Sequence, residues 1–206
     1  MFRLYRQLEK GEFIVVWGDT AQGGADSNFL PFISKTRIDV PLVMQKRGTA
    51  ASALPHIIQA LEWIYQKTGV PPVICLERNN GGASAMETLV NSNTENHWVV
   101  YYMKDQQGQR TDKPGWDTVE WSRAKMIGEW EVAFNGCQLT IYDKEVIAQH
   151  KKFITNKRGR PEAAPNAHDD GVMSLAGGWQ LFKTESPRVK KSTNTTTGNI
   201  TALYPR

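Results

Sequence analysis

Two acidic residues of this 206-residue sequence follow the runs that are most typical of buried strands. Asp19 comes after Phe-Ile-Val-Val-Trp at 13–17 and one glycine, and Glu77 comes directly after Val-Ile-Cys-Leu at 73–76. Continuous runs of β-branched and aromatic residues predict strands that are buried on both faces. In open α/β sheets, the carboxyl ends of the strands form the edge at which ligands bind. If these two strands are neighbours, the two carboxylates lie side by side.

A third acidic site is the pair Asp169 and Asp170, which precedes the apolar residues of a helix predicted at 166–182. A helix N-terminus carries partial positive charge, so two aspartates there have a simple alternative role as caps of a core helix. Three acidic groups at the ends of elements are nevertheless what a divalent-metal site needs. We therefore expect this pair to face Asp19 and Glu77.

Carboxylates gathered in this way repel one another and raise their own pKa values unless a cation lies between them. Mg²⁺ and Mn²⁺ prefer oxygen ligands, and the sequence lacks the His and Cys spacing of a zinc site. Two such ions about 4 Å apart can hold the attacking water and the leaving oxygen of a phosphodiester. The acidic residues therefore predict a site for two Mg²⁺ or Mn²⁺ ions.

The remaining pattern predicts an α/β domain with a mixed sheet, because strands alternate with helices after an initial meander. Residues 20–28 are rich in turn formers and residues 104–121 are polar, so both are expected to be loops. The expected strands are 13–17, 29–34, 38–47, 73–76 and 98–103, with an edge strand at 139–142 and a hairpin at 153–163. The expected helices are 54–65, 83–89, 122–135, 143–152 and 166–182.

Composition indicates one soluble domain in a reducing compartment. The 25 Lys and Arg residues exceed the 21 Asp and Glu residues, which gives a net charge of +4 that is compatible with nucleic-acid binding. No apolar run approaches the ~18 residues of a membrane span, and no signal peptide is visible. Two cysteines do not suggest a disulfide framework. We expect a lead-in at 1–12, the domain at 13–183 and a flexible tail at 184–206.

Several motifs, taken in order, resemble the nuclease domain of tailed-phage terminase large subunits. Each motif is weak alone, but their order and spacing over residues 13–182 are specific. The motifs are Gly18-Asp19-Thr20, Leu76-Glu77, Gly115-Trp116-x-Thr118, Gln149-x-x-x-Phe153 followed by Gly-Arg-x-Glu-Ala, and His168-Asp169-Asp170-x-Val172.

The resemblance implies a ribonuclease-H-like fold, with a mixed sheet of about five main strands flanked by helices and an added hairpin. It also implies metal-dependent cutting of concatemeric double-stranded DNA during genome packaging. Asp19, Glu77 and Asp170 match the metal-binding, catalytic acids of that family, and Asp169 matches the accessory acid beside them. Asp26 falls where some members carry a further acid; its alternative role is to cap the loop before the next strand.

Other residues near these motifs have both a functional and a structural interpretation. His168 either orients a carboxylate or simply caps and packs. Arg78 follows Glu77, and a group of basic residues surrounds the predicted hairpin; phosphate contacts are one use and a solvated surface is the other. That group consists of Lys152, Lys157, Arg158 and Arg160.

The sequence has no Gly-x-x-x-x-Gly-Lys-Ser/Thr phosphate loop, so we expect no bound nucleotide. Terminases begin with an ATPase motor, and we expect this chain to be the nuclease domain without it. The resemblance implies double-stranded DNA, the terminase ATPase domain, the small terminase subunit and the portal as partners. It places the protein in the cytoplasm of an infected bacterial host, not in the secreted fraction.

Three alternatives remain open at this stage, and a fourth is set aside. A Holliday-junction-resolvase-like or a transposase-like nuclease would show the same acids but act on branched DNA or on DNA ends. Sugar kinases and actin-like ATPases share the fold, but they need a second Gly-rich phosphate loop that the sequence does not show. A non-catalytic domain that docks on DNA or on the portal would keep the acids only as charge balance.

Overall fold

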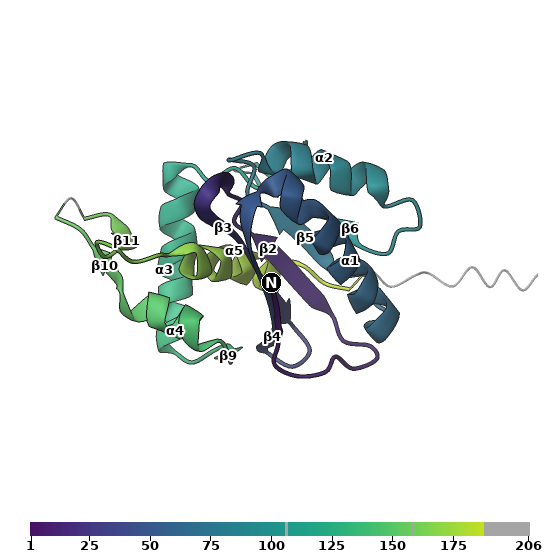
Figure 1. Cartoon of the computed structure of the whole chain (residues 1–206), viewed down its shortest axis with the longest axis horizontal. Helices are drawn as coiled ribbons and strands as arrows, with labels where there is room; N and C mark the ends of the chain where they lie inside the picture. The colour runs from purple at the N-terminus through teal and green to yellow at the C-terminus, as the bar shows by residue number, and fades with distance from the viewer. Residues whose placement is uncertain (106, 158, 188–206) are drawn as a thin grey trace, which may run out of the picture.

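The computed structural model describes residues 1–105, 107–157 and 159–187, without the side chains of 24–26. It has three layers, with α1 and α2 on one face of a central sheet and α3, α4 and α5 on the other (Figure 1). The helices are α1 (Ala50–Thr68), α2 (Gly82–Ser92), α3 (Glu120–Asn135), α4 (Lys144–Lys151) and α5 (Asp170–Thr184).

The central sheet has seven strands in the described residues and mixes parallel with antiparallel pairs. In spatial order these are β1 (Phe2–Leu4), β4 (Asp39–Thr49), β3 (Gln22–Ser34), β2 (Ile14–Gly18), β5 (Val73–Leu76) and β6 (Val99–Val100), with β9 (Thr140–Ile141) beside β4. Two hairpins lie outside it, formed by β7 (Tyr102–Lys104) with β8 (Arg110–Pro114) and by β10 (Phe153–Thr155) with β11 (Pro161–Ala163). The predicted α/β class with a mixed, helix-flanked sheet is confirmed.

Strand β2 is the centre of the sheet and lies between β3 and β5. Its side chains alternate: Ile14 and Val16 pack toward α1 and α2, whereas Val15 and Trp17 pack toward α3 and α5. All four are at most 1% exposed, so the prediction of a strand buried on both faces is confirmed. Because β2 and β5 are parallel and pair Gly18 with Leu76, the residues that follow both strands emerge at the same edge.

Helix α5 approaches β2 so closely that a glycine is required in the contact. A Cβ at Gly177 would lie 2.2 Å from the indole Cε2 of Trp17. We expect Gly177→Ala to lower the free energy of unfolding by about 1–3 kcal/mol, because the buried indole cannot move without strain. Gly128 on α3 is the matched control: a Cβ there meets nothing within 4 Å, so Gly128→Ala should stabilise the helix by about 0.5–1 kcal/mol. Equal changes in urea midpoint for both variants would contradict this packing argument.

Two regions that were expected to be loops contain strands, so these predictions were wrong. Strand β3 begins at Gln22. Its first half pairs irregularly with β4, and for this reason its sequence resembles that of a loop. The Asn28 side chain replaces part of the regular ladder, since its amide donates to the carbonyl of Gly48 (2.7 Å) and its oxygen accepts from the backbone N–H of Ala21 (3.1 Å). In the second region, β8 folds back on β7.

Other predicted elements are present in the structure but have different boundaries. The predicted strand at 98–103 is divided into β6 and β7, and α5 starts at Asp170 and not at Asn166, whose positive φ of 62° is incompatible with a helix. The predicted edge strand at 139–142 and the hairpin at 153–163 are confirmed. The Asp143 side chain caps α4 by accepting from the backbone N–H groups of Glu145 and Val146. None of the described helices is long and apolar enough to cross a bilayer.

The first residues, expected to be a lead-in, are fastened to the sheet. Strand β1 pairs antiparallel with β4, and Arg6 reaches two buried acids behind it. Its Nε donates to Asp39 Oδ2 at 2.6 Å, and its Nη2 contacts Glu12. Glu12 is 1% and Asp39 3% exposed, so Arg6 supplies the charge that makes their burial tolerable. The domain limits at 13 and 183 stay a prediction, and residues 188–206 lie outside the described residues.

Candidate metal centre

Strand pairing fixes the backbone of both predicted edge acids. The backbone N–H of Asp19 donates to the carbonyl of Phe29, and its carbonyl accepts from the N–H of Phe29, both at 3.1 Å. The N–H of Glu77 donates to the carbonyl of Gly18 at 2.8 Å. Asp19 and Glu77 are therefore held at the ends of neighbouring parallel strands, which the sequence alone had left open.

The turns after these strands are tied to each other by side chains. The hydroxyl of Thr20 donates to the carbonyl of Asn79 at 2.9 Å. The amide of Asn79 in turn donates to Glu77 Oε1 at 2.8 Å. This bond orients the carboxylate of Glu77.

The N-terminus of α5 brings the other two acids to this edge. Ser174 Oγ donates to the carbonyl of Phe29 at 2.9 Å, so the helix is tied to the residue that also fixes Asp19. Gln149 Oε1 of α4 accepts from the N–H of Gly171 at 2.8 Å and thus caps α5. The side chain of Asp169 makes no cap hydrogen bond. The alternative in which this aspartate merely caps the helix is therefore not what the structure shows.

The four carboxylates are close enough for their charges to interact. Burial raises the pKa of Asp19 well above its usual range, and the charges of three other acids raise it further. These acids are Glu77, Asp170 and Asp169, in order of decreasing effect. The charges of these acids thus act on Asp19, although Asp19 and Asp170 are 151 positions apart in the sequence.

The donor chemistry of this cluster fits a hard divalent cation. All four groups offer carboxylate oxygens, and their mutual repulsion is what such an ion relieves. As the side chains stand, no three His, Cys, Asp or Glu residues in the described part of the chain surround a common point.

A groove of about 610 Å³ opens beside Asp170. Its wall includes Lys46 and Arg47 at the end of β4, together with the exposed His168. Lys152 lines a smaller adjoining hollow that also contains His168. Sequence reasoning had not assigned Lys46 and Arg47, because two basic residues in an exposed strand end give no signal that separates them from a solvated surface.

The predicted DNA-binding residues have different surroundings. The guanidinium of Arg78 is bonded to other residues of the protein. Its Nε pairs with Asp117 Oδ1 at 2.9 Å, and its Nη1 donates to the carbonyl of Pro114 at 2.8 Å. Lys157 is exposed in the hairpin turn, and Arg160 lines a groove beside Arg123 of α3, a residue that was not predicted. Arg158 and the side chain of Asp26 lie outside the described residues.

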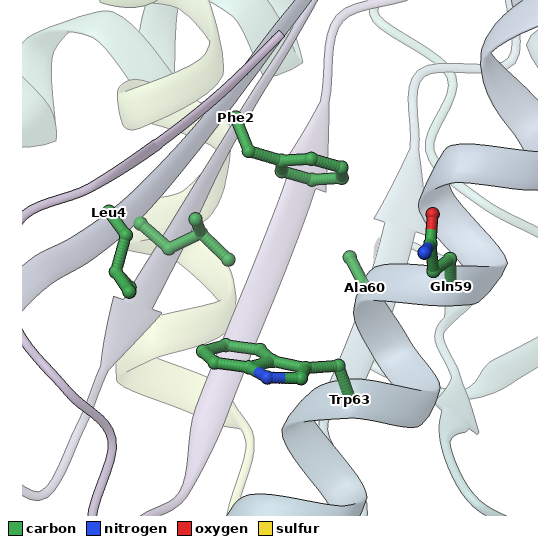
Figure 2. A pocket seen from close by; sticks show the side chains of 6 residues that line it. Phe2, Leu4, Gln59, Ala60 and Trp63 are labelled. Atoms are coloured by element: carbon green, nitrogen blue, oxygen red, sulfur yellow. The ribbon is translucent and has the colours of Figure 1, made fainter.

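An apolar cavity of about 250 Å³ lies elsewhere, between the first strands and α1. Figure 2 shows Phe2 and Leu4 facing Ala60 and Trp63 across it, with Gln59 at its side. None of the four clustered acids lines this cavity, so it is separate from the candidate metal centre.

Comparison with known proteins gives a consistent result at the level of structure. No family model and no curated protein matches the sequence. Among solved structures, the large terminase nuclease of the thermophilic phage G20c with bound magnesium superposes with a TM-score of 0.63 at 11% identity, covering 87% of this chain and 86% of that one. The large terminase nuclease domain of Thermus phage P74-26 gives 0.62 at 12% identity, covering 90% and 87%. That of phage P22 gives 0.56 at 8% identity, covering 88% and 87%.

The G20c nuclease has also been solved with cobalt and with zinc. At these identities the likeness concerns the fold, and it extends over nearly the whole length of the compared chains. The chain therefore has the ribonuclease-H-like fold of the nuclease domains of large terminases.

Proposed function

We propose that this chain is a divalent-metal-dependent DNA endonuclease domain that acts in phage genome packaging. The observation that carries the proposal is the convergence of four carboxylates, Asp19, Glu77, Asp169 and Asp170, at one edge of this fold. The likeness to terminase nucleases, one of them with bound magnesium, supports it.

In this proposal, Asp19 and Asp170 hold one Mg²⁺ or Mn²⁺ ion, and Asp19 and Glu77 hold a second, with Asp169 as an accessory acid. Bound divalent ions supply an activated water and stabilise the leaving 3′ oxygen. The protein's own part is positional: Asn79 orients Glu77 through its 2.8 Å hydrogen bond. Strand pairing at Phe29 keeps Asp19 and the start of α5 in register.

The DNA contacts proposed here are to the backbone. Lys46, Arg47 and Lys152 line the grooves beside Asp170 and His168, where they can neutralise phosphates. Such contacts carry no base information, so we infer weak and sequence-tolerant cleavage by this domain. The proposed substrate is concatemeric double-stranded DNA in the cytoplasm of an infected bacterium. The ATPase domain, small subunit and portal are the proposed partners.

The test is cleavage of supercoiled plasmid with Mn²⁺, Mg²⁺, Ca²⁺ or EDTA. We expect nicking and linearisation only with Mn²⁺ or Mg²⁺, and a fall of at least about 100-fold in Asp170→Asn and Glu77→Gln, because each removes a charged metal ligand. Glu87→Gln, which removes the same charge from an exposed site on α2, is the matched control and should cut like wild type.

Activity that survives both substitutions would remove the carboxylate cluster from the proposal. Inactivity of the wild type with every metal would favour the non-catalytic docking role. A preference for four-way junctions over duplex DNA would favour the resolvase-like alternative, and joining of DNA ends would favour the transposase-like one.

A further inference from the structure

A second groove, of about 480 Å³, lies between the N-terminus of α3 and the β10–β11 hairpin. Thr118, Glu120, Arg123 and Arg160 are among its lining residues. We propose that this α3–hairpin groove binds a phosphate of the DNA backbone beside the cleavage site, with Arg123 as a positioning residue. The inference rests on the proposed function for its substrate.

Arg123 is held in place without being neutralised. It is half-buried, and its Nη1 donates to the carbonyl of Pro161 in the hairpin at 3.0 Å. Within the described residues, neither Arg123 nor Arg160 forms an ion pair. Burial and, next, the charge of Arg160 lower the pKa of Arg123, while the charges of Asp169, Glu77 and Glu162 offset part of this effect. An anion placed between the two guanidinium groups removes their mutual repulsion, and a phosphate matches the guanidinium geometry.

Thr118 gives an independent sign of a missing ligand. Its Oγ1 is buried but has no hydrogen-bond partner in the described part of the chain, although buried hydroxyls are normally paired. Rotation of this side chain toward the groove would let a phosphate oxygen accept its hydrogen bond. The groove also lies at the positive end of the α3 dipole, which favours an anion. Glu120 is the opposing charge in the lining, and two guanidinium groups outweigh it.

The position of the groove fits a path for DNA across the acidic cluster. The charges of Asp169 and Glu77 act on Arg123, so the α3–hairpin groove is next to the candidate metal centre. The groove with Lys46 and Arg47 instead adjoins Asp170. Both basic grooves therefore border the acidic cluster. In the proposal, a DNA strand bound at the cluster has a phosphate within reach of each groove.

The test is binding of a labelled duplex in EDTA, followed by fluorescence anisotropy over a range of NaCl concentrations. We expect Arg123→Gln to weaken binding about tenfold, the effect of losing one charge-assisted hydrogen bond. The slope of log K against log [NaCl] should fall in magnitude by about 0.9, the value for one lost phosphate contact. Lys125→Gln, an exposed charge loss on the same helix outside the groove, is the matched control and should keep the wild-type slope.

Three further variants separate phosphate binding from a purely structural role. Arg123→Lys should restore the slope but not the full affinity, because lysine keeps the charge without the planar fork. Thr118→Val should weaken binding without lowering the melting temperature, because it removes an unpaired hydroxyl. Arg160→Gln, an exposed change in the hairpin, should reproduce the loss of slope even if Arg123→Gln folds poorly.

A wild-type slope in both Arg123→Gln and Arg160→Gln would overturn the inference. This result is distinct from failure of the proposed function, which is decided by plasmid cleavage with metal. If the wild type does not cut DNA but Arg123→Gln and Arg160→Gln reduce the salt slope of DNA binding, the phosphate groove is supported and the nuclease function is rejected.

Discussion

Replacing Asp19 by asparagine is expected to abolish plasmid cleavage and to leave the metal-free protein at least as stable as wild type. The carboxylate is shared by both proposed ions, so we expect a loss of more than about 100-fold. Its charge is unfavourable in the metal-free fold, because it is buried beside three other acids that raise its pKa. Asparagine keeps the shape of the side chain and removes the charge.

The pH dependence of this effect has a definite sign. A carboxyl whose pKa is raised by folding destabilises the protein above that pKa, and the penalty disappears as the pH falls through it and the folded state takes up the proton. The melting temperature of Asp19→Asn should therefore exceed that of wild type most at alkaline pH, and the two should converge toward acid. Added Mg²⁺ should stabilise the wild type more than the variant, because only the folded site binds the ion.

Scanning calorimetry in EDTA and in Mg²⁺ measures both effects. Asp112→Asn, at an exposed position of β8, is the matched control and should change neither cleavage nor melting. A lower melting temperature for metal-free Asp19→Asn would show that this acid has a structural role and is not a ligand held against repulsion.

Arg6→Gln is expected to give the largest loss of stability, about 3–5 kcal/mol, because it leaves two buried acids without their cation. Burial alone would raise the pKa of Glu12, but hydrogen bonds from Arg6 and its other donors bring it below the usual range. A lowered pKa contributes stability above the pKa of the unfolded chain, and this contribution is lost as the pH falls through the folded value. The difference in free energy of unfolding between wild type and variant should therefore be largest at neutral pH and should shrink in acid.

Urea denaturation at several pH values checks this prediction. Arg37→Gln is the matched control, because the Arg37–Glu9 pair is about half exposed and should contribute less than about 1 kcal/mol. Similar losses in the two variants would mean that the burial of Glu12 and Asp39 does not set the energetic importance of Arg6.

The acids were predictable because their position depends on local features. Asp19 and Glu77 end continuous apolar runs, and parallel strands send their carboxyl ends to one edge. What the sequence alone left open was whether β2 and β5 are neighbours, since that is decided by packing between distant segments. The fold class followed from the same alternation of strands and helices, and the family resemblance specified it further.

The residues that were missed depend on long-range contacts. Strand β3 extends to Gln22 only because Asn28 and β4 satisfy the hydrogen bonds of its backbone. The glycine and serine residues of this stretch give no signal of that pairing. In the sequence Arg123 is one of several charged residues of a helix, and only the structure shows that the hairpin carbonyl of Pro161 accepts a hydrogen bond from it. Thr118 becomes informative only when its hydroxyl is seen to be buried and unpaired.

The order of the chain has a consequence for biosynthesis. Asp19 and Glu77 lie on strands made early, whereas Asp169 and Asp170 arrive with α5, the last helix of the described chain. That helix supplies Trp179 and Leu175 to the same core as Trp17, so the sheet cannot finish packing before α5 docks. While α5 is still inside the ribosome, the emerged part of the chain therefore carries only two of the four carboxylates, and its core is incompletely packed. Completion of the acidic cluster and completion of the fold are thus one event, so a partly translated chain does not yet have the four carboxylates together.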